Sequence, residues 1–278
     1  KITGVKSLNI KDSTAPVTIT AIPDTTTVLG LRGSQINNLT ATYKTLTGKT
    51  DSLTVNLDNA TDAMVDVGTG FEFATLNILS ASSIKSFNVR VPTLTISGAA
   101  TLTVGDTTTT TGLIGVTDIE LSNTSAIKLG KIGTTATSST IYLTTFKAPN
   151  NTGGITTDVI QGATGGLAIQ LGSGADSISV QDNAAASTDI NDIRLGAGND
   201  SLTFTKGANG NTYISGEDGN DTINIGGVSS SASSINTIDG GNGDDKITVS
   251  VSGSYLISGG AGNDIITDGA GSNVIDGG

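Results

Sequence analysis

The sequence contains no cysteine, no histidine and no tryptophan, and only one methionine. Without cysteine the chain has no disulfides, no thiolate nucleophiles and no cysteine-based zinc sites. Without histidine it lacks the zinc ligands, the serine-triad base and the general base that most hydrolases use. We therefore expect that this chain is not an enzyme.

Aromatic and charged residues are also scarce, at 3% and 14% of the chain. The 14 Lys and Arg residues are outnumbered by 25 Asp and Glu residues, which gives a net charge of −11. Nucleic acid is a poor partner for such a chain, because phosphate binding needs a surplus of Lys and Arg. An acidic chain also repels itself unless cations screen or bind it.

Long apolar runs are missing as well. No run approaches the roughly 18–20 residues that a membrane-spanning helix needs, so we predict no transmembrane segment. The chain starts without an initiator methionine or a basic, then apolar, secretory signal. It opens inside a strand-like stretch and ends inside a repeated motif, so we expect a fragment of a longer protein whose targeting signals lie elsewhere.

The chain is rich in Thr, Ser, Val, Ile and glycine, with 38 glycines in all. Thr, Val and Ile suit pleated strands, and glycine suits tight turns. Short runs with period 2, such as Leu53–Leu57 and Thr93–Ile96, recur through residues 1–148. Their spacing suits a β-solenoid or an antiparallel sandwich, and the scarcity of two-residue hairpin signals favours the solenoid. We predict an all-β fold.

Two prolines indicate the domain organisation. Pro92 marks a soft seam, and the stretch from Pro149 to Gly154 is the best linker candidate. We predict a β-rich region over residues 1–150, a linker or junction over 151–165 and a repeat domain over 166–278. Polar stretches at 107–111, 134–140, 182–189 and 229–234 are expected to be loops or exposed edges.

One acidic cluster lies outside the repeats. Asp58, Asp62 and Asp66 are spaced by four, so a short helix around 58–66 would place them on one face. We expect a solvated acidic face or turn here, and a further calcium site is the alternative.

The last third of the chain repeats the motif G-G-x-G-x-D-x-U, in which U is a large apolar residue. Five full copies are Leu171–Ile178, Leu195–Leu202, Gly216–Ile223, Gly240–Ile247 and Gly259–Ile266, followed by a degenerate copy at Asp268–Ile275 and the start of a seventh at Gly277. An isoleucine precedes each motif by two residues, and an apolar residue follows each motif aspartate by two. We predict that each turn is bracketed by inward-pointing strand residues.

The motif aspartates lie 24, 21, 24 and 19 residues apart. These intervals approximate one coil of two strands and two turns, which is about 18 residues, plus a few extra. We therefore predict a ladder of turns on one edge, with the opposite turn looped out. The final step, nine residues from Asp264 to Asn273, is expected to begin a two-sided arrangement.

The residue types in these turns point to a hard cation. Glycines reach φ > 0, and the aspartate carboxylate meets carbonyls that the turn leaves free. An oxygen-rich site of this kind selects Ca²⁺. The alternative is a metal-free β-helix whose glycine turns carry solvated aspartates.

Residues 166–278 resemble the RTX repeats of bacterial proteins exported by type I secretion, and the upstream short strands are similar in style to those of RTX-containing surface-layer proteins. The resemblance implies a right-handed parallel β-roll with several Ca²⁺ ions bound between successive coils. It assigns carboxylate ligands to Asp176, Asp200, Asp221, Asp245 and Asp264. It assigns carbonyl ligands to Gly172, Gly174, Gly196, Gly198, Gly216, Gly219, Gly240, Gly243, Gly259 and Gly262. Leu171, Leu195, Glu217 and Asn273 depart from the motif, and we expect weaker sites there.

The resemblance also implies a function. It predicts a secreted structural component of a bacterial surface layer that self-associates into a two-dimensional lattice at the cell surface. Calcium would drive folding after export, because binding energy then becomes folding energy. Cell-surface polysaccharide or lipopolysaccharide is the further partner implied. The alternatives are a calcium-dependent RTX adhesin segment and the C-terminal part of a type I-secreted exoenzyme.

Overall fold

The computed structural model describes residues 5–34, 38–43, 46, 50–105, 113–132, 143–161, 165–181, 190–206, 211–226 and 234–278. Across these residues the chain forms strands and no helix, and the strand pairs align in parallel. The predicted all-β parallel solenoid is therefore confirmed. The predicted loops at 107–111, 134–140 and 182–189, and most of 229–234, lie outside the described residues.

The chain divides into two compact units, residues 1–141 and 142–278. The first unit contains β1 (Ser7–Lys11), β2 (Val17–Ile22), β3 (Val28–Ser34), β4 (Leu39–Tyr43), β5 (Ser52–Thr61), β6 (Met64–Asp66), β7 (Phe73–Ile78), β8 (Ser82–Ile84), β9 (Ser86–Asn88), β10 (Thr93–Gly98), β11 (Leu102–Val104), β12 (Leu113–Ile114), β13 (Asp118–Leu121) and β14 (Ile127–Ile132). The second contains β15 (Thr145–Lys147), β16 (Ile155–Ile160), β17 (Ala168–Gln170), β18 (Ser177–Gln181), β19 (Ile190–Arg194), β20 (Ser201–Lys206), β21 (Asn211–Ser215), β22 (Thr222–Ile225), β23 (Asn236–Asn242), β24 (Lys246–Val249), β25 (Tyr255–Ala261), β26 (Ile265–Thr267) and β27 (Val274–Asp276).

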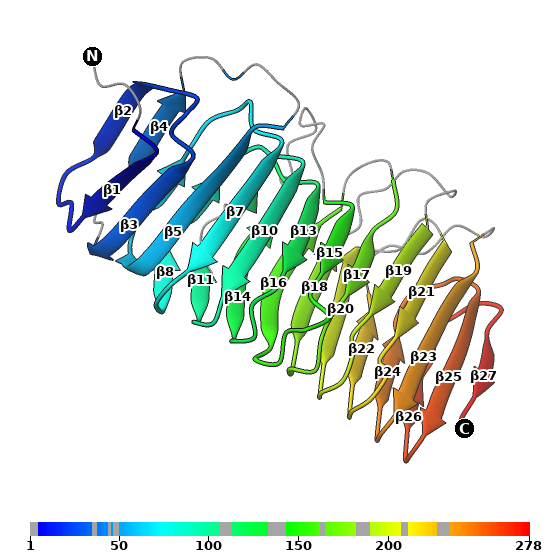
Figure 1. Ribbon diagram of the computed structural model, residues 1–278. Coiled ribbons are helices and arrows are strands. Elements are labelled where there is room, and N and C mark those ends of the chain that lie inside the picture. The colour runs from blue at the N-terminus through cyan, green and yellow to red at the C-terminus, as the bar shows by residue number, and fades with distance from the viewer. Residues whose placement is uncertain are drawn as a thin grey trace. The chain divides into compact units, whose positions relative to one another are not determined.

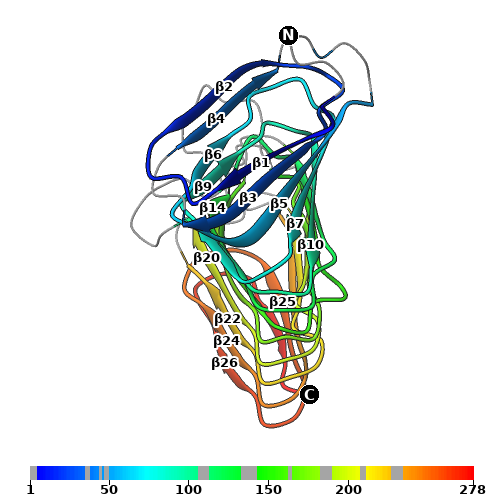
Figure 2. The same ribbon diagram turned by 60° about the vertical axis from the view of Figure 1, so that its left-hand side comes forward.

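In the first unit, successive coils stack their strands in register. One sheet runs through β1, β3, β5, β7, β10 and β13, and another runs through β2, β4, β6 and β9 (Figure 2). The period-2 pattern places one apolar residue per strand in an inward column, which is Leu29, Val55, Leu76, Ile96 and Leu121. All five are at most 3% exposed, so this column forms part of the core.

The helix considered around residues 58–66 is wrong. These residues end β5 and form β6, with Asp62 in the left-handed region at φ 63° in the turn between them. Leu53, Val55 and Leu57 alternate with polar residues and are buried by their neighbours in the stack. Packing against adjacent coils therefore decides this segment in favour of a strand.

In the second unit each coil contributes two strands. The odd-numbered strands β15 to β27 form one sheet and the even-numbered strands β16 to β26 form the other (Figure 1). The isoleucines before the motifs form one in-register column, Ile169, Ile193, Ile214, Ile238 and Ile257. The apolar residues after the aspartates form the facing column, Ile178, Leu202, Ile223 and Ile247. The residues of both columns are buried, as the motif spacing predicted. The prediction is wrong for the next residue of each column: Ile266 is only half-buried and Ile275 is 48% exposed.

The close stacking of the glycine turns gives a testable contrast. Gly219 has φ 136°, and a Cβ placed on it would overlap the carbonyl oxygen of Gly198. Gly226 carries no positive φ, and the nearest atom to a Cβ there is Phe204 O at 3.5 Å. We expect Gly219→Ala to lower the free energy of unfolding by roughly 2–6 kcal/mol, from backbone strain and overpacking together. Gly226→Ala should change it by less than about 1 kcal/mol.

Chemical denaturation of both variants in chelator measures this difference without a contribution from bound metal. Equal stabilities for the two variants would contradict the tight stacking of the turns.

Candidate metal centre

The five motif aspartates stack along one edge of the second unit and form an aspartate ladder, Asp176, Asp200, Asp221, Asp245 and Asp264. The Oδ1 atom of each accepts a backbone N–H from the coil before it. The donor-to-Oδ1 distances are 2.6 Å for Ile155 to Asp176, 2.7 Å for Asp176 to Asp200, 2.8 Å for Asp200 to Asp221, 2.8 Å for Asp221 to Asp245 and 2.9 Å for Asp245 to Asp264. The structure thus brings all five predicted carboxylates into one column.

The second oxygen of each carboxylate is the chemically unusual atom. The Oδ2 atoms of all five aspartates are buried and accept no hydrogen bond from the described residues. The first four aspartates are themselves at most 3% exposed. A buried polar atom without a partner costs about 1–3 kcal/mol, and more when it is charged. Such an oxygen is stable only beside a cation or with a proton bound.

Backbone carbonyls meet these oxygens in the three turns that begin with glycine. A Cβ on Gly259 would lie 2.6 Å from Asp264 Oδ2 and 2.8 Å from Gly277 O. A Cβ on Gly240 would overlap Asp245 Oδ2 and Gly259 O, and one on Gly216 would overlap Asp221 Oδ2 and Gly240 O. Each of these glycines therefore faces the same pair: its own aspartate Oδ2 and a carbonyl oxygen of the next coil. Paired carboxylate and carbonyl oxygens could hold a hard cation such as Ca²⁺.

The first two turns differ, because Leu171 and Leu195 stand at the leading glycine position and are buried. The carbonyls of Gly172 and Gly196 accept backbone N–H groups of the next coil, from Ala197 at 2.8 Å and Asp218 at 3.0 Å. These two carbonyls therefore belong to the backbone hydrogen-bond ladder. The repeated oxygen pair occurs at the three glycine-led turns.

The other predicted glycines allow the turns of successive coils to stack closely on one another. Gly198, Gly219, Gly243 and Gly262 occupy the same motif position, and a Cβ on any of them would overlap the carbonyl of its counterpart one coil earlier, which for Gly198 is Gly174. Only glycine allows the turns to approach this closely.

A second side-chain ladder flanks the aspartates on the exposed side of the turns. Asn220 N donates to Asn199 Oδ1 at 2.9 Å, Asp244 N to Asn220 Oδ1 at 2.8 Å, and Asn263 N to Asp244 Oδ1 at 2.8 Å. Here the later coil donates to the earlier one, opposite to the direction of the aspartate ladder. Sequence reasoning missed this column, although Asn or Asp precedes the motif aspartate in copies two to five.

The structure extends the ladder by one turn that sequence reasoning treated as a linker. Ser173 N donates to Asn151 O at 2.8 Å, and Ile155 begins β16 and stands at the aspartate position. Ile155 lies 21 residues before Asp176, which is the interval between Asp200 and Asp221. The interval could have predicted this turn from the sequence, but the turn has no motif aspartate by which to recognise it.

The degenerate copy lies on the opposite edge of the coil. Gly271 bridges to Gly253, and Tyr255 N donates to Asn273 Oδ1 at 3.0 Å. Gly277 then returns to the aspartate edge, because its carbonyl faces Gly259. The nine-residue step therefore crosses to the second edge, as the spacing predicted.

Burial shifts the acidity of the ladder. It raises the pKa of Asp176 to about 6 and the pKa of Asp200 and Asp221 to about 7, from an ordinary 3.8. The backbone N–H that each accepts opposes the shift in part. Burial also raises the pKa of Asp245.

These shifts predict the pH dependence of the metal-free chain. From about pH 4 to about pH 7, the folded state keeps protons that the unfolded state has released. The free energy of unfolding in chelator should therefore fall as pH rises through this window and level off above it. Thermal melts across the window measure it, and a rising midpoint would contradict it. Asp221→Asn should reduce the slope, whereas Asp218→Asn in the same turn should keep it.

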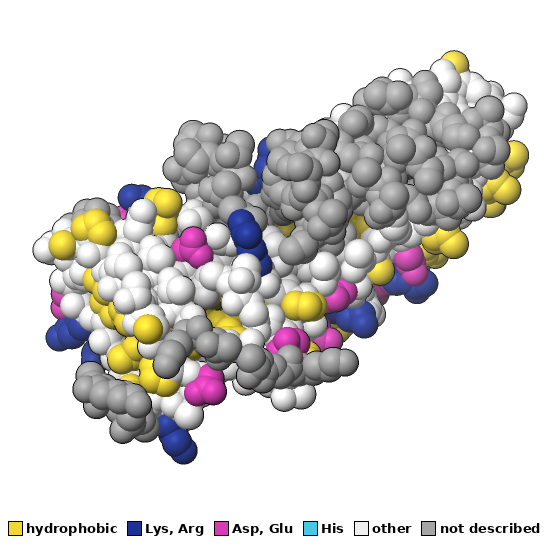
Figure 3. Space-filling model, turned by 90° about the horizontal axis from the view of Figure 1, so that it is seen from above, with side chains coloured by type: hydrophobic (Ala, Val, Ile, Leu, Met, Phe, Trp, Pro, Cys, Tyr) yellow, Lys and Arg dark blue, Asp and Glu magenta, His cyan; other side chains and the backbone are white. Residues whose placement is uncertain are grey.

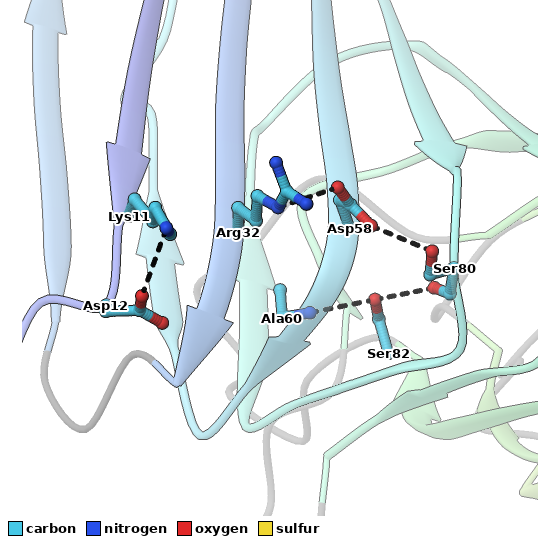
Figure 4. Close-up of polar contacts among 7 residues, drawn as sticks. All are labelled: Lys11, Asp12, Arg32, Asp58, Ala60, Ser80 and Ser82. Carbon is cyan, nitrogen blue, oxygen red and sulfur yellow. Dashed lines mark hydrogen bonds and ion pairs between the residues drawn. The ribbon is translucent and has the colours of Figure 1, made fainter.

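Two of the three acidic residues of the predicted cluster in the first unit, Asp58 and Asp66, have structural partners. Asp58 pairs with Arg32 at 3.2 Å and accepts a hydrogen bond from Ser80 at 2.8 Å (Figure 4). Asp66 Oδ1 accepts the N–H of Gly68 at 3.0 Å. Within the described part of the chain no three acidic side chains converge on a common point. A metal site among the described residues would therefore use at most two carboxylates, with backbone carbonyls as further ligands.

No protein-family model, curated protein or solved structure matches the chain. In the described residues no helix is long and apolar enough to cross a membrane.

Proposed function

We propose that this chain is a calcium-stabilised structural segment of a bacterial surface layer, and that the aspartate ladder is its calcium site. One observation carries the proposal: the same pair of oxygens, a buried aspartate Oδ2 and a glycine carbonyl of the next coil, recurs at three successive turns. A single pair could be a local accident of packing, whereas three pairs in register form a repeated site.

The residues present fit a calcium ion. The ion takes six to eight oxygen ligands, from carboxylates and backbone carbonyls alike. Asp221 with Gly240, Asp245 with Gly259, and Asp264 with Gly277 would supply ligands from adjacent coils. Bound calcium would compensate the negative charge of the buried carboxylates, whose Oδ2 atoms have no other partner among the described residues. Because its ligands come from two coils, it would also couple each coil to the next.

The distribution of charge supports a cation requirement in the second unit. Residues 1–141 contain ten Lys or Arg and ten Asp or Glu, whereas residues 142–278 contain four and fifteen. The entire net charge of −11 therefore belongs to the second unit. Self-repulsion of this size disfavours the compact state unless cations compensate it. Such a unit would be less stable during export and would gain stability where calcium is plentiful, because binding energy adds to folding energy.

A structural role agrees with the remaining surface. On the face seen in Figure 3, acidic and basic side chains are interspersed among uncharged ones. The proposal assigns no catalytic residue to this chain, which has neither histidine nor cysteine. Stacked coils with small polar outer residues suit lateral contact between copies.

Negative-stain electron microscopy of the full chain tests the structural role. We expect two-dimensional arrays after calcium addition and dispersed particles in chelator, with magnesium at equal concentration as the control. A chain that binds calcium yet stays monomeric at high concentration would overturn the surface-layer role and leave the calcium ladder standing.

A further inference from the structure

A second candidate site lies in the second unit, on the outer face of β15, β17 and β19. Lys147, Ala168, Ile169, Gln170, Asp192 and Arg194 line a hollow of about 320 Å³ there. Lys147, Gln170 and Arg194 are in register across the three strands, and Ala168 is in register with Asp192. Strands lie about 4.8 Å apart, so the backbones of Lys147 and Arg194 are separated by about 10 Å. The hollow exists because Ala168 presents only a methyl group between longer neighbours.

The charge of the hollow contrasts with that of the unit around it. The unit has four cationic residues against fifteen acidic ones, and two of the four, Lys147 and Arg194, line this hollow. Both side chains are exposed, so they are available to a ligand. The hollow thus holds two cations against one carboxylate, that of Asp192, and this surplus of positive charge favours an anionic group between Lys147 and Arg194.

Arg194 is already held in place by its neighbours. Its Nε lies 3.2 Å from Asp192 Oδ1 and its Nη2 lies 3.5 Å from Asp192 Oδ2. The guanidinium also lies over the ring of Tyr213, 5.5 Å from the ring centroid. These contacts fix the plane of the guanidinium and leave further N–H groups for a ligand, since the group carries five. A preorganised donor loses less conformational entropy on binding.

We propose that this hollow binds an acidic saccharide, with its carboxylate or phosphate between Lys147 and Arg194. The hydroxyl groups of the sugar would pair with the Gln170 amide, which both donates and accepts, and with the Asp192 carboxylate, which accepts. The volume lies at the lower end for a small-ligand site and suits one sugar unit. A bare anion would leave the Gln170 amide unused, together with the acceptor positions of Asp192 that Arg194 does not occupy. The site is separate from the aspartate ladder, so its failure would leave the proposed function untouched.

Ligand-observed NMR titration of the full chain in calcium-containing buffer tests this inference. The probes are galacturonic acid, glucose 6-phosphate, galactose and inorganic phosphate. We expect one or both of the acidic sugars to bind at least tenfold more tightly than galactose and than phosphate. A preference between the two acidic sugars tells carboxylate from phosphate recognition.

Variants locate the binding. Lys147→Ala and Arg194→Ala should each weaken binding of the preferred sugar about tenfold or more, as expected for a lost charge-assisted hydrogen bond. Lys246→Ala removes an exposed cation from the other sheet of the same unit and should change affinity less than about twofold. Far-UV circular dichroism confirms that each variant is folded. Equal binding of phosphate and acidic sugar, or an equal loss in Lys246→Ala, would overturn the inference.

Discussion

Thermal melts of the full chain should show a rise in midpoint of roughly 15–30 °C when calcium replaces chelator at neutral pH. A ligand that binds only the folded state at a hundred times its Kd stabilises by about 2.7 kcal/mol per site. Three glycine-led turns would together contribute on the order of 8 kcal/mol, which is comparable with the whole stability of an ordinary domain. Each kcal/mol shifts the midpoint of a unit this size by about 2–4 °C.

The control separates specific binding from screening of the second unit's charge. Magnesium at equal concentration should raise the midpoint much less, because this smaller ion demands near-octahedral geometry and keeps its waters. Sodium chloride at matched ionic strength should act through screening alone. Equal midpoints in calcium, magnesium and chelator would contradict the calcium ladder.

Exchange of one buried carboxylate for an amide should lower the free energy of unfolding in calcium, whereas in chelator it should leave it unchanged or raise it. Asp245→Asn keeps the Oδ1 acceptor for Asp221 N–H and converts the unpaired Oδ2 into an amide nitrogen. In calcium we expect a loss of about 3 kcal/mol, the contribution of one site. In chelator we expect no loss or a gain, because the variant removes an uncompensated buried charge.

Asp244→Asn is the matched control, since it removes the same charge from the neighbouring residue of the same turn. Asp244 is exposed, and the equivalent positions in the adjacent coils already hold Asn220 and Asn263. Its effect should stay within about 0.5 kcal/mol in both conditions. Urea denaturation with and without calcium measures all four differences. If Asp245→Asn lowered the free energy of unfolding in chelator as much as in calcium, the aspartate ladder would stabilise the fold without binding metal.

The repeat predicted much of the second unit, because strand registers follow directly from motif spacing. Ile214 and Ile238 pair in one column and Ile223 and Ile247 in the other, as the positions around the aspartates required. The turn before Ile155 escaped prediction because an apolar residue replaces the aspartate that marks the position.

At other positions the sequence alone was insufficient because packing between coils decides the local structure. The residues around Asp62 have the spacing of a helical face, and only packing against neighbouring coils makes them strands. Leu171 and Leu195 looked like weak ligand positions in the sequence. The structure shows them as core residues, and the repeated oxygen pair is found at the three turns that begin with glycine.

The two side-chain ladders run in opposite directions, and this gives the coils of motif copies two to five two unlike faces. In the aspartate ladder each coil provides an acceptor to the coil before it. In the second ladder, formed by Asn199, Asn220, Asp244 and Asn263, each coil provides an acceptor to the coil after it. Coils that carry both ladder positions can therefore dock on one another in one orientation only, and none of the described ladder contacts sets a final number of coils. The second unit behaves as a short one-dimensional polymer whose subunits are coils, with stability built from nearest-neighbour terms. Its length is free to vary by duplication or loss of whole coils without any change to the rules of contact.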